Sequence, residues 1–209
     1  MIHYEFPDRE ASKLAGIPLL DVAPRPMADW NVVIKTIEDK VLATLALVLF
    51  GPFMLMIAIA IKLDSTGPVL FRQARQGFNN QLIEIYKFRS MHHKMCDDDA
   101  VHLTTRDDPR VTRLGAFLRR ASLDELPQIF NVLKGDMSMV GPRPHAKLAK
   151  AGTRLYPEVV DQYAARHKVK PGITGWAQVN GWRGETDTEE KIIQRVQHDV
   201  YYIENWSLW

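Results

Sequence analysis

One uncharged apolar segment constrains this chain more than any other feature. It runs from Val41 to Ile61 with the sequence VLATLALVLFGPFMLMIAIAI, and charged residues flank it on both sides. As a straight α-helix these 21 residues would rise roughly 30 Å, the thickness of a hydrocarbon core. The preceding forty residues are polar and acidic, and no small-residue cleavage site follows, so the segment is not a signal peptide. We therefore expect membrane lipids to be a partner of this chain.

Gly51-Pro52 lies at the midpoint of this segment. Pro52 lacks the amide hydrogen that would bond the carbonyl oxygen of Val48, and its ring crowds that oxygen, which predicts a sharp bend. Each half is about 15 Å long and reaches roughly half the bilayer. The pattern predicts a re-entrant membrane helix over residues 35–64, hinged at Gly51 and Pro52, that enters and leaves by the same face. A straight transmembrane span and a buried core helix stay open as alternatives.

The rest of the chain predicts short elements. Residues 1–34 contain four prolines and no sustained period, which indicates a leader or linker. Residues 69–77 and 81–91 alternate apolar and polar side chains, as short strands do. Helical spacing of apolar residues predicts three helices, near 111–118, 126–133 and 188–203, the first of them basic and amphipathic. We expect an α+β fold: a small, mostly helical domain with short strands, preceded by the broken membrane helix.

Charge is unevenly distributed along the sequence. The whole chain has 27 Lys and Arg residues against 25 Asp and Glu residues, but residues 62–183 hold 20 against 12. This middle part is the one expected to bind anions. The lone cysteine, Cys96, allows neither an intrachain disulfide nor a cysteine-rich zinc site, which fits a reducing cytosolic setting. We expect no structural metal.

The sharpest local motif is SLDELP, residues 122–127. Ser122 and Glu125 match a capping box, so they could merely begin a helix. Pro127 weakens that interpretation, because it would lie inside such a helix and forfeit a hydrogen bond. A helix that begins at Asp124 removes the conflict and leaves Glu125 free of capping.

Adjacent carboxylates at a helix N-terminus experience the positive end of the helix dipole, which favours their ionised form. Asp124 and Glu125 could together hold a hard divalent cation such as Mg²⁺, or one could bind the cation while the other attacks phosphorus. Arg119 and Arg120 nearby suit phosphate oxygens.

A second motif is GPRP, residues 141–144. Gly141 leaves its backbone amide open to close approach, while Pro142 and Pro144 stiffen the loop that presents Arg143. An arginine on a rigid loop loses less entropy when it binds a phosphate. A tight turn with a solvated arginine is the alternative.

Two further stretches carry weaker signals. The segment KPGITGWAQVNGWRG, residues 170–184, could bind a flat base and its phosphates through Gln178 and Asn180, although tryptophan packing in a small core also explains it. Its glycines match no dinucleotide or P-loop pattern. Asp97-Asp98-Asp99 could ligate a metal, as aspartates do in nucleotide-sugar transferases, or form a solvated acidic loop.

Three segments of the chain resemble the bacterial sugar transferase family of monotopic phosphoglycosyl transferases: YKFRSM, TRDDPRVTRLGAFLRRASLDELPQIFNVLKGDMSMVGPRPH and RHKVKPGITGWAQVNGWRGETDT. The resemblance covers about residues 35–209. Within the family, GWRGETDT and the final YYIENWSLW are most similar to the undecaprenyl-phosphate glucose phosphotransferases of the colanic acid type. Full members continue beyond Trp209, and long members carry an additional transmembrane and Rossmann-like portion before the linker.

The resemblance implies transfer of a hexose 1-phosphate, glucose 1-phosphate being favoured, from a UDP-sugar to undecaprenyl phosphate with release of UMP. This is the first membrane step of exopolysaccharide synthesis, at the cytoplasmic face of the bacterial inner membrane. It implies a phosphosugar carried covalently on an aspartate and a requirement for Mg²⁺. Residues 65–209 would form the phosphoglycosyl transferase domain, without a C-terminal segment of the full members.

By motif, Asp124 matches the nucleophile and Glu125 its metal-binding partner, and both are candidate metal ligands. Arg119 and Arg143 match phosphate-binding arginines, and Lys87 and Arg89 of YKFRSM are further candidates for substrate binding. In the membrane helix, Gly51 stands where members often have a serine before the proline.

Several alternatives stay open. The donor could carry galactose or another sugar in the same reaction. A metal-dependent glycosyltransferase using residues 97–99 would release UDP instead of UMP. A third hypothesis is a membrane-attached assembly protein without chemistry of its own. We expect no nucleic-acid partner, and a homo-oligomer stays open.

Overall fold

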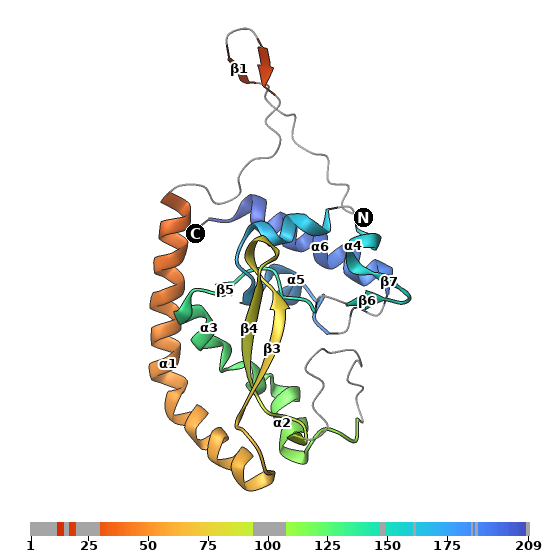
Figure 1. Cartoon of the computed structure of the whole chain (residues 1–209). Helices are drawn as coiled ribbons and strands as arrows, with labels where there is room; N and C mark the ends of the chain where they lie inside the picture. The colour runs from red at the N-terminus through yellow and green to blue at the C-terminus, as the bar shows by residue number, and fades with distance from the viewer. Residues whose placement is uncertain are drawn as a thin grey trace.

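The structure, a computed structural model of the chain, describes residues 12–14, 17–19, 30–93, 108–146, 149–160, 162–184, 186 and 188–207. One long helix, α1 (Trp30–Asp64), runs along one side of the domain and packs against α3 (Gln128–Lys134) (Figure 1). Within residues 1–34, β1 (Ser12–Leu14) and β2 (Ile17–Leu19) form an antiparallel hairpin. The fold is mixed helix and strand and mostly helical, as expected.

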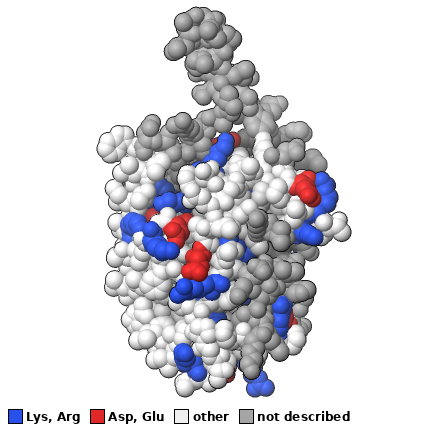
Figure 2. Space-filling model, viewed as in Figure 1, with Lys and Arg blue, Asp and Glu red and all other residues white. Residues whose placement is uncertain are grey.

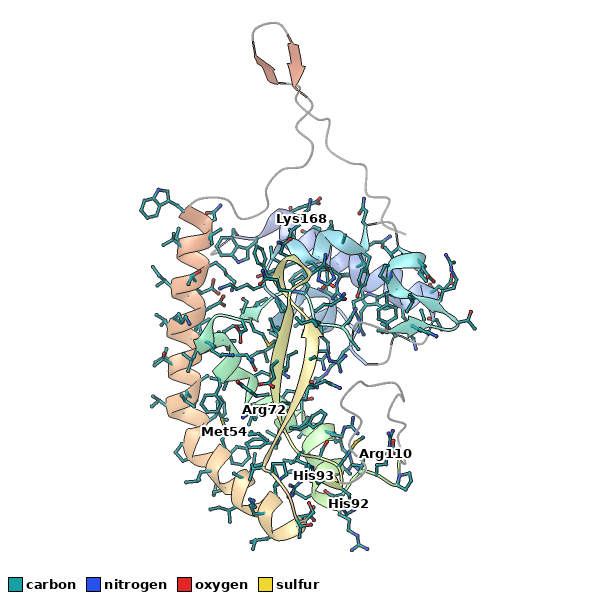
Figure 3. The ribbon with its side chains drawn as sticks, viewed as in Figure 1. Met54, Arg72, His92, His93, Arg110 and Lys168 are labelled. Carbon is teal, nitrogen blue, oxygen red and sulfur yellow. The ribbon has the colours of Figure 1, made fainter. Side chains whose placement is uncertain are left out.

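The predicted break at Gly51 and Pro52 is not confirmed, because α1 stays helical through both residues. The bend itself is present as a curve: the C-terminal half of α1 turns toward the rest of the domain (Figure 1). Proline removes one helical hydrogen bond and crowds one carbonyl oxygen, and the helix accommodates both effects by curving. Met54, which lies in this half, points toward the domain and is buried (Figure 3).

The N-terminal half of α1 is fastened to the domain by polar contacts. The Asp39 carboxylate accepts hydrogen bonds from Ser138 Oγ and from the Met139 amide, each at 2.9 Å, and Lys35 Nζ lies 2.9 Å from the same carboxylate. Lys40 donates to the carbonyl oxygens of Val132 and Leu133, where α3 ends. A cation at these carbonyls meets the negative end of α3. Both halves of α1 are thus held by the same domain.

The two predicted strands are confirmed. β3 (Leu70–Gln76) and β4 (Leu82–Phe88) pair antiparallel around the turn η1 (Phe78–Asn80). Alternation along the ribbon places residues 71, 73 and 75 of β3 on the same face as residues 87, 85 and 83 of β4. The main core contains residues from α1, this ribbon, α2, α3 and the segment that follows α3, namely Ala43, Met54, Ile57, Ile61, Ile85, Phe88, Leu118, Ile129, Val132 and Met137.

Two of the predicted helices form one connected unit. α2 (Arg113–Ala121) begins at Thr112, whose side chain accepts from the Gly115 amide, and η3 (Leu123–Glu125) separates it from α3 (Gln128–Lys134). Asn131 of α3 is fully buried and bonds β4 on both sides, accepting from the Tyr86 amide and donating to the Glu84 carbonyl oxygen. This amide therefore fixes α3 and η3 against the ribbon.

Several of the remaining elements build a second, smaller core. β5 (Ser138–Val140) pairs in parallel with β8 (Gly172–Thr174), and β6 (Lys150–Ala151) pairs with β7 (Arg154–Leu155). The helices are α4 (Tyr156–Val159), η4 (Tyr163–Lys168), α5 (Trp176–Val179) and α6 (Glu189–Asn205). α6 confirms the third predicted helix. Its buried Ile192 and Val196 pack with Ala151, Tyr156 and Tyr163.

Candidate active site

The acidic pair lies in a short 3₁₀-helical turn, η3, rather than at the start of an α-helix. α2 ends at Ala121, and Ser122 follows in the left-handed region (φ 58), which reverses the chain into η3. The next helix, α3, begins only at Gln128, after Pro127, so the expected start at Asp124 is wrong. The capping box is also absent, because the Glu125 carboxylate binds two basic side chains instead of a backbone amide.

Two basic side chains, Arg143 and Lys87, bind the Glu125 carboxylate. Arg143 donates from Nη1 to Oε2 at 3.0 Å and from Nη2 to Oε1, while Lys87 Nζ lies 3.2 Å from Oε1. Lys87 comes from β4 and Arg143 from the loop after β5, so one carboxylate joins three segments that are distant in the sequence. A bidentate arginine contact of this kind fixes both position and orientation.

The two carboxylates differ in their pKa values. Burial alone would raise the pKa of Glu125, but the hydrogen bond from Arg143 and the charge of Lys87 outweigh it and lower the pKa to about 2. Asp124 is buried, and its carboxylate makes no hydrogen bond or ion pair within the described residues. Burial raises the pKa of Asp124 above its usual range, against the attraction of Lys87, Arg119 and Arg143. The expectation that both carboxylates are favoured in the ionised form is therefore met only by Glu125.

The loop that presents Arg143 is shaped by two strands. β5 and β8 approach so closely that a Cβ on Gly141 would lie 2.6 Å from the Lys170 carbonyl oxygen. The Gly141 amide donates to the Thr174 carbonyl oxygen at 2.9 Å, and the Pro142 carbonyl oxygen accepts from the Gly172 amide at 3.0 Å. Gly141 is thus needed for packing of backbone on backbone, and its amide is used inside the protein rather than left for a ligand.

A buried ion pair between Arg166 and Asp199 fixes the backbone of Arg143. Arg166 donates to the Arg143 carbonyl oxygen at 2.6 Å and to the Asp199 carboxylate of α6 at 2.8 Å. The side chains of Arg166 and Asp199 are only 1% and 2% exposed. His145 Nδ1 contacts the same guanidinium, and burial with the charge of Arg166 keeps the pKa of His145 well below its usual value. The sequence offered no sign of this network, because its members are far apart in the chain.

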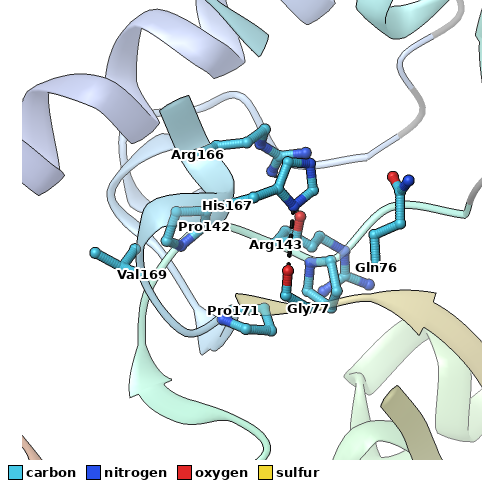
Figure 4. A pocket seen from close by; sticks show the side chains of 9 residues that line it. Gln76, Gly77, Pro142, Arg143, Arg166, His167, Val169 and Pro171 are labelled. Carbon is cyan, nitrogen blue, oxygen red and sulfur yellow. Dashed lines mark hydrogen bonds between the residues drawn. The ribbon is translucent and has the colours of Figure 1, made fainter. Parts of the chain in front are cut away.

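A small pocket lies beside Arg143, between the end of β3 and the segment after η4 (Figure 4). His167 lines it and contacts the Gly77 carbonyl oxygen through Nδ1 at 3.3 Å, the dashed line in the figure. Burial lowers the pKa of His167 to about 4, so this ring is neutral near pH 7. The lining residues are Gln76, Gly77, Pro142, Arg143, Pro144, Arg166, His167, Val169 and Pro171.

One member of the site was missed by the sequence reasoning. Arg75 of β3 interacts electrostatically with Arg143 and Glu125, and burial together with the charge of Arg143 lowers its pKa to about 10. The signal that could have found it is the alternation along the ribbon, which places residue 75 on the face of residue 87.

Three of the predicted site residues, Arg89, Asn180 and Gln178, form no hydrogen bond to Glu125, Arg143 or Lys87 within the described residues. Arg89 donates to the carbonyl oxygens of Ile61, Ser65 and Pro68 and so closes the C-terminal end of α1. Asn180 bonds the Trp176 carbonyl oxygen within α5 at 2.8 Å. Gln178 Oε1 is buried without a hydrogen-bond partner among the described residues. Asp97-Asp98-Asp99 lies outside the described residues.

The acidic pair does not fit a divalent cation in this arrangement. Both oxygens of Glu125 are bonded by Arg143 or Lys87, and only Asp124 has free carboxylate oxygens. Within the described ranges, no group of three or more His, Cys, Asp and Glu side chains could hold a metal ion. What the cluster offers is a net positive site around one unbonded carboxylate, which suits an anionic phosphate substrate.

Several known proteins are similar in sequence to this chain. The chain is 53% identical over 185 residues to an undecaprenyl-phosphate glucose phosphotransferase of Komagataeibacter xylinus, covering 88% of this chain and 35% of that protein. It is 53% identical over 197 residues to a UDP-glucose:undecaprenyl-phosphate glucose-1-phosphate transferase of Escherichia coli K12, covering 94% of this chain and 42% of the relative. A third relative, the exopolysaccharide production protein PSS of Rhizobium leguminosarum, is 49% identical, with 85% of this chain and 89% of that protein covered.

The chain therefore spans less than half the length of the first two relatives. The Bacterial sugar transferase family matches residues 30–209, from the first residue of α1 to the end of the sequence. This match includes the acidic turn, the GPRP loop and both strands of the ribbon. The chain belongs to the bacterial sugar transferase family.

Proposed function

We propose that this chain transfers glucose 1-phosphate from UDP-glucose to undecaprenyl phosphate and releases UMP, through a phosphosugar held covalently on Asp124. The observation that carries the proposal is the contrast within the acidic pair. Glu125 is locked by Arg143 and Lys87, whereas the buried Asp124 carboxylate beside it is unbonded within the described residues. An unbonded carboxylate next to fixed cations suits nucleophilic attack on a phosphate. The names of the relatives support the donor and the acceptor.

The reaction proceeds in two displacements at the same phosphorus atom. A carboxylate oxygen of Asp124 attacks the phosphorus that carries the glucose, and the bond to the bridging diphosphate oxygen breaks, so UMP departs. A phosphate oxygen of undecaprenyl phosphate then attacks this phosphorus, and the bond to Asp124 breaks. The products are undecaprenyl diphosphate glucose and the regenerated carboxylate. Arg143, Lys87 and Arg119 stabilise the negative charge on the transferred group.

The placement of α1 supports attachment of the domain to one face of the membrane. The helix is long and apolar enough to cross a bilayer, with a mean hydropathy of 2.5 over its most apolar window, of which only 17% is buried. The edge of the molecule along α1 is mostly uncharged (Figure 2). A buried core helix would be covered, so the exposed face favours contact with lipid.

Both halves of α1 also pack on the same domain, through Asp39 near one end and Ile61 near the other. A perpendicular crossing would draw the charged domain into the hydrocarbon region, which is costly. We therefore propose a monotopic, re-entrant or interfacial placement at the cytoplasmic face of the inner membrane, where a cytosolic donor meets a lipid acceptor.

A requirement for Mg²⁺ is retained in the proposal from the family resemblance alone. Because Arg143 and Lys87 bond both carboxylate oxygens of Glu125, the two displacements above involve only side chains of the protein. Chelation with EDTA is expected to stop UMP release, and added Mg²⁺ to restore it, whereas unchanged release in EDTA would remove the metal from the proposal.

The test is nucleotide release with undecaprenyl phosphate and a panel of UDP-sugars, using protein in detergent or nanodiscs. We expect UMP from UDP-glucose, with slower release from UDP-galactose. Asp124→Asn should abolish both UMP release and a labelled phosphosugar adduct. The matched control is Asp136→Asn, since Asp136 pairs with Lys134 away from the site.

Three results would contradict the proposal. Release of UDP would indicate a glycosyltransferase, and replacement of residues 97–99 by alanine should then stop turnover. Full activity of Asp124→Asn would exclude the covalent route. Membrane binding without any nucleotide release would favour a non-catalytic assembly role.

A further inference from the structure

Arg75 and Lys87 lie on the same face of the β3–β4 ribbon. In the register of the two strands Arg75 is opposite Ile83, Gln73 opposite Ile85 and Phe71 opposite Lys87. Directly opposed residues of an antiparallel pair project from the same face. The ribbon therefore carries two cations toward the GPRP loop and the acidic turn, and Lys87 already contacts Glu125 there.

Arg75 is anchored by a neutral side chain. Its Nε and Nη2 donate to Gln73 Oε1 at 3.1 Å and 2.5 Å. Gln73 is buried and sits two residues away on the same strand, so the guanidinium is oriented from its own element. Within the described residues Arg75 forms no ion pair, whereas Lys87 and Arg143 both do.

This arrangement costs free energy in the absence of a ligand. A half-buried arginine without a carboxylate partner loses part of its hydration, and the neighbouring guanidinium of Arg143 repels it. Glu125 is the negative group that acts most strongly on it, but that carboxylate is already bonded by two other cations. An anion bound between Arg75 and Arg143 would remove both penalties.

The end of β3 borders the loop that presents Arg143. The amide of Gln76, the residue after Arg75, donates to the carbonyl oxygen of His145 in that loop at 3.3 Å. Arg75 also interacts electrostatically with Arg143 and Glu125. A diphosphate bound by Arg143 would therefore lie near a second guanidinium, that of Arg75.

We propose that Arg75 is a substrate-binding residue that, with Arg143, binds the diphosphate of the nucleoside diphosphate substrate. This inference deepens the proposed function and rests on it for the identity of the nucleoside. The recognised chemistry is a diphosphate dianion or trianion, which a rigid guanidinium fork binds well. The same contact stabilises charge on the leaving phosphate as its bond to phosphorus breaks.

The experiment measures binding of inorganic diphosphate and of UDP to the full chain in detergent, by calorimetry, for Arg75→Gln and Arg75→Met. We expect both variants to bind both ligands roughly tenfold or more weakly, as loss of a charge-assisted hydrogen bond predicts. The melting temperature should equal or exceed that of the wild type, because a half-buried charge without an ion-pair partner has been removed. Diphosphate should stabilise the wild type against heat more than either variant.

Arg72→Gln is the matched control. Arg72 lies on the same strand but on the opposite face, where it forms an exposed pair with Glu84 at 3.5 Å. This variant removes one positive charge from β3 without touching the site, so its affinity for diphosphate should match that of the wild type. A general effect of net charge would instead weaken Arg72→Gln and the Arg75 variants equally, and would contradict the inference.

The outcomes separate this inference from the proposed function. Diphosphate binding equal to the wild type in the folded Arg75 variants, or no diphosphate binding by the wild type, would overturn the inference. A lower melting temperature with unchanged diphosphate affinity would show a structural role for Arg75 and would overturn it as well. Weakened diphosphate binding in a chain that releases no UMP from UDP-sugars would leave the inference standing and remove the proposed function.

Discussion

Arg143 donates hydrogen bonds to both carboxylate oxygens of Glu125, and Lys87 donates to one of the same two oxygens. The contact connects the loop after β5, the turn after α2 and strand β4. It leaves the neighbouring Asp124 as the unbonded carboxylate of the pair within the described residues. The geometry divides two adjacent acids of similar chemistry into one that organises cations and one that is free to react.

Replacement of Arg143 tests this division. Arg143→Gln removes the fork that holds Glu125 and one cation that acts on Asp124. We expect UMP release to fall by about two to three orders of magnitude, as for loss of one group that stabilises transition-state charge. Arg154→Gln is the control, because Arg154 makes an exposed pair with Glu189 and should leave the rate unchanged. Equal rates for the two variants would contradict the assignment.

The pH dependence of turnover follows from the two carboxylates. Asp124 must be ionised to attack phosphorus, and burial raises its pKa, so kcat/KM should fall with decreasing pH at values above the usual pKa of an aspartate. Glu125, with a pKa lowered to about 2, stays ionised throughout this range. Its ionisation therefore adds no second step to the pH dependence of kcat/KM. A rate profile that stays flat down to the ordinary aspartate range would show that burial of Asp124 does not control its ionisation.

The shifted pKa of Glu125 predicts how stability depends on pH. This pKa is lower in the folded chain than in the unfolded chain, so the pairing of Glu125 stabilises the fold fully above the ordinary glutamate pKa. That contribution is lost as the pH falls toward about 2. Urea unfolding of Glu125→Gln should show a smaller decline over this window than the wild type, and an equal decline would contradict the prediction.

Loss of Asp199 should destabilise the fold. Asp199→Asn leaves the guanidinium of Arg166 buried without its anion, and breaking a buried pair on one side typically costs about 3–5 kcal/mol. Because Arg166 also bonds the Arg143 carbonyl oxygen, UMP release should fall at temperatures where the variant is still folded. Chemical denaturation measures the first effect. A loss below about 1 kcal/mol, comparable with that of an exposed pair, would show that Arg166 finds another partner.

Two glycines should respond in opposite directions to alanine. A Cβ at residue 141 would lie 2.6 Å from the Lys170 carbonyl oxygen, so Gly141→Ala must part β5 from β8 and displace Arg143. We expect lower stability and slower UMP release. Gly51→Ala meets no atom within 4 Å and lies in a helix, where alanine is favoured by about 0.5–1 kcal/mol. Melting curves of the two variants distinguish them, and a stable, active Gly141→Ala would refute the close approach.

The exposed face of α1 predicts membrane binding. Leu49 is 72% exposed, so Leu49→Asp should weaken partition into lipid vesicles while leaving the melting temperature in detergent almost unchanged. Met54 lies on the buried side, and Met54→Asp should lower stability instead. Vesicle sedimentation and thermal melting separate the two effects. Unchanged sedimentation of Leu49→Asp would mean that this face does not enter lipid.

Local pattern was sufficient for much of the fold. Alternation in residues 69–91 predicted the ribbon, and apolar spacing predicted α2, α3 and α6, because these signals depend on neighbours within a few residues. The motifs also directed attention to Asp124, Glu125 and Arg143, which the fold brings together. The boundaries near residue 124 and the uninterrupted course of α1 through Pro52 depended on packing, which a local rule for proline does not include.

The order of residues along the chain was enough to specify the elements, the apolar character of α1 and the residue types of the candidate site. Packing in three dimensions settled that Arg89 closes the end of α1 whereas Arg75 lies at the end of β3 that borders the GPRP loop, and that the Arg166–Asp199 pair supports this loop. Hydrogen bonds and charge pairs act over a few ångströms in space. Which side chains come that close depends on how the ribbon, the turn and the loop pack around one core, and no spacing along the chain encodes those distances.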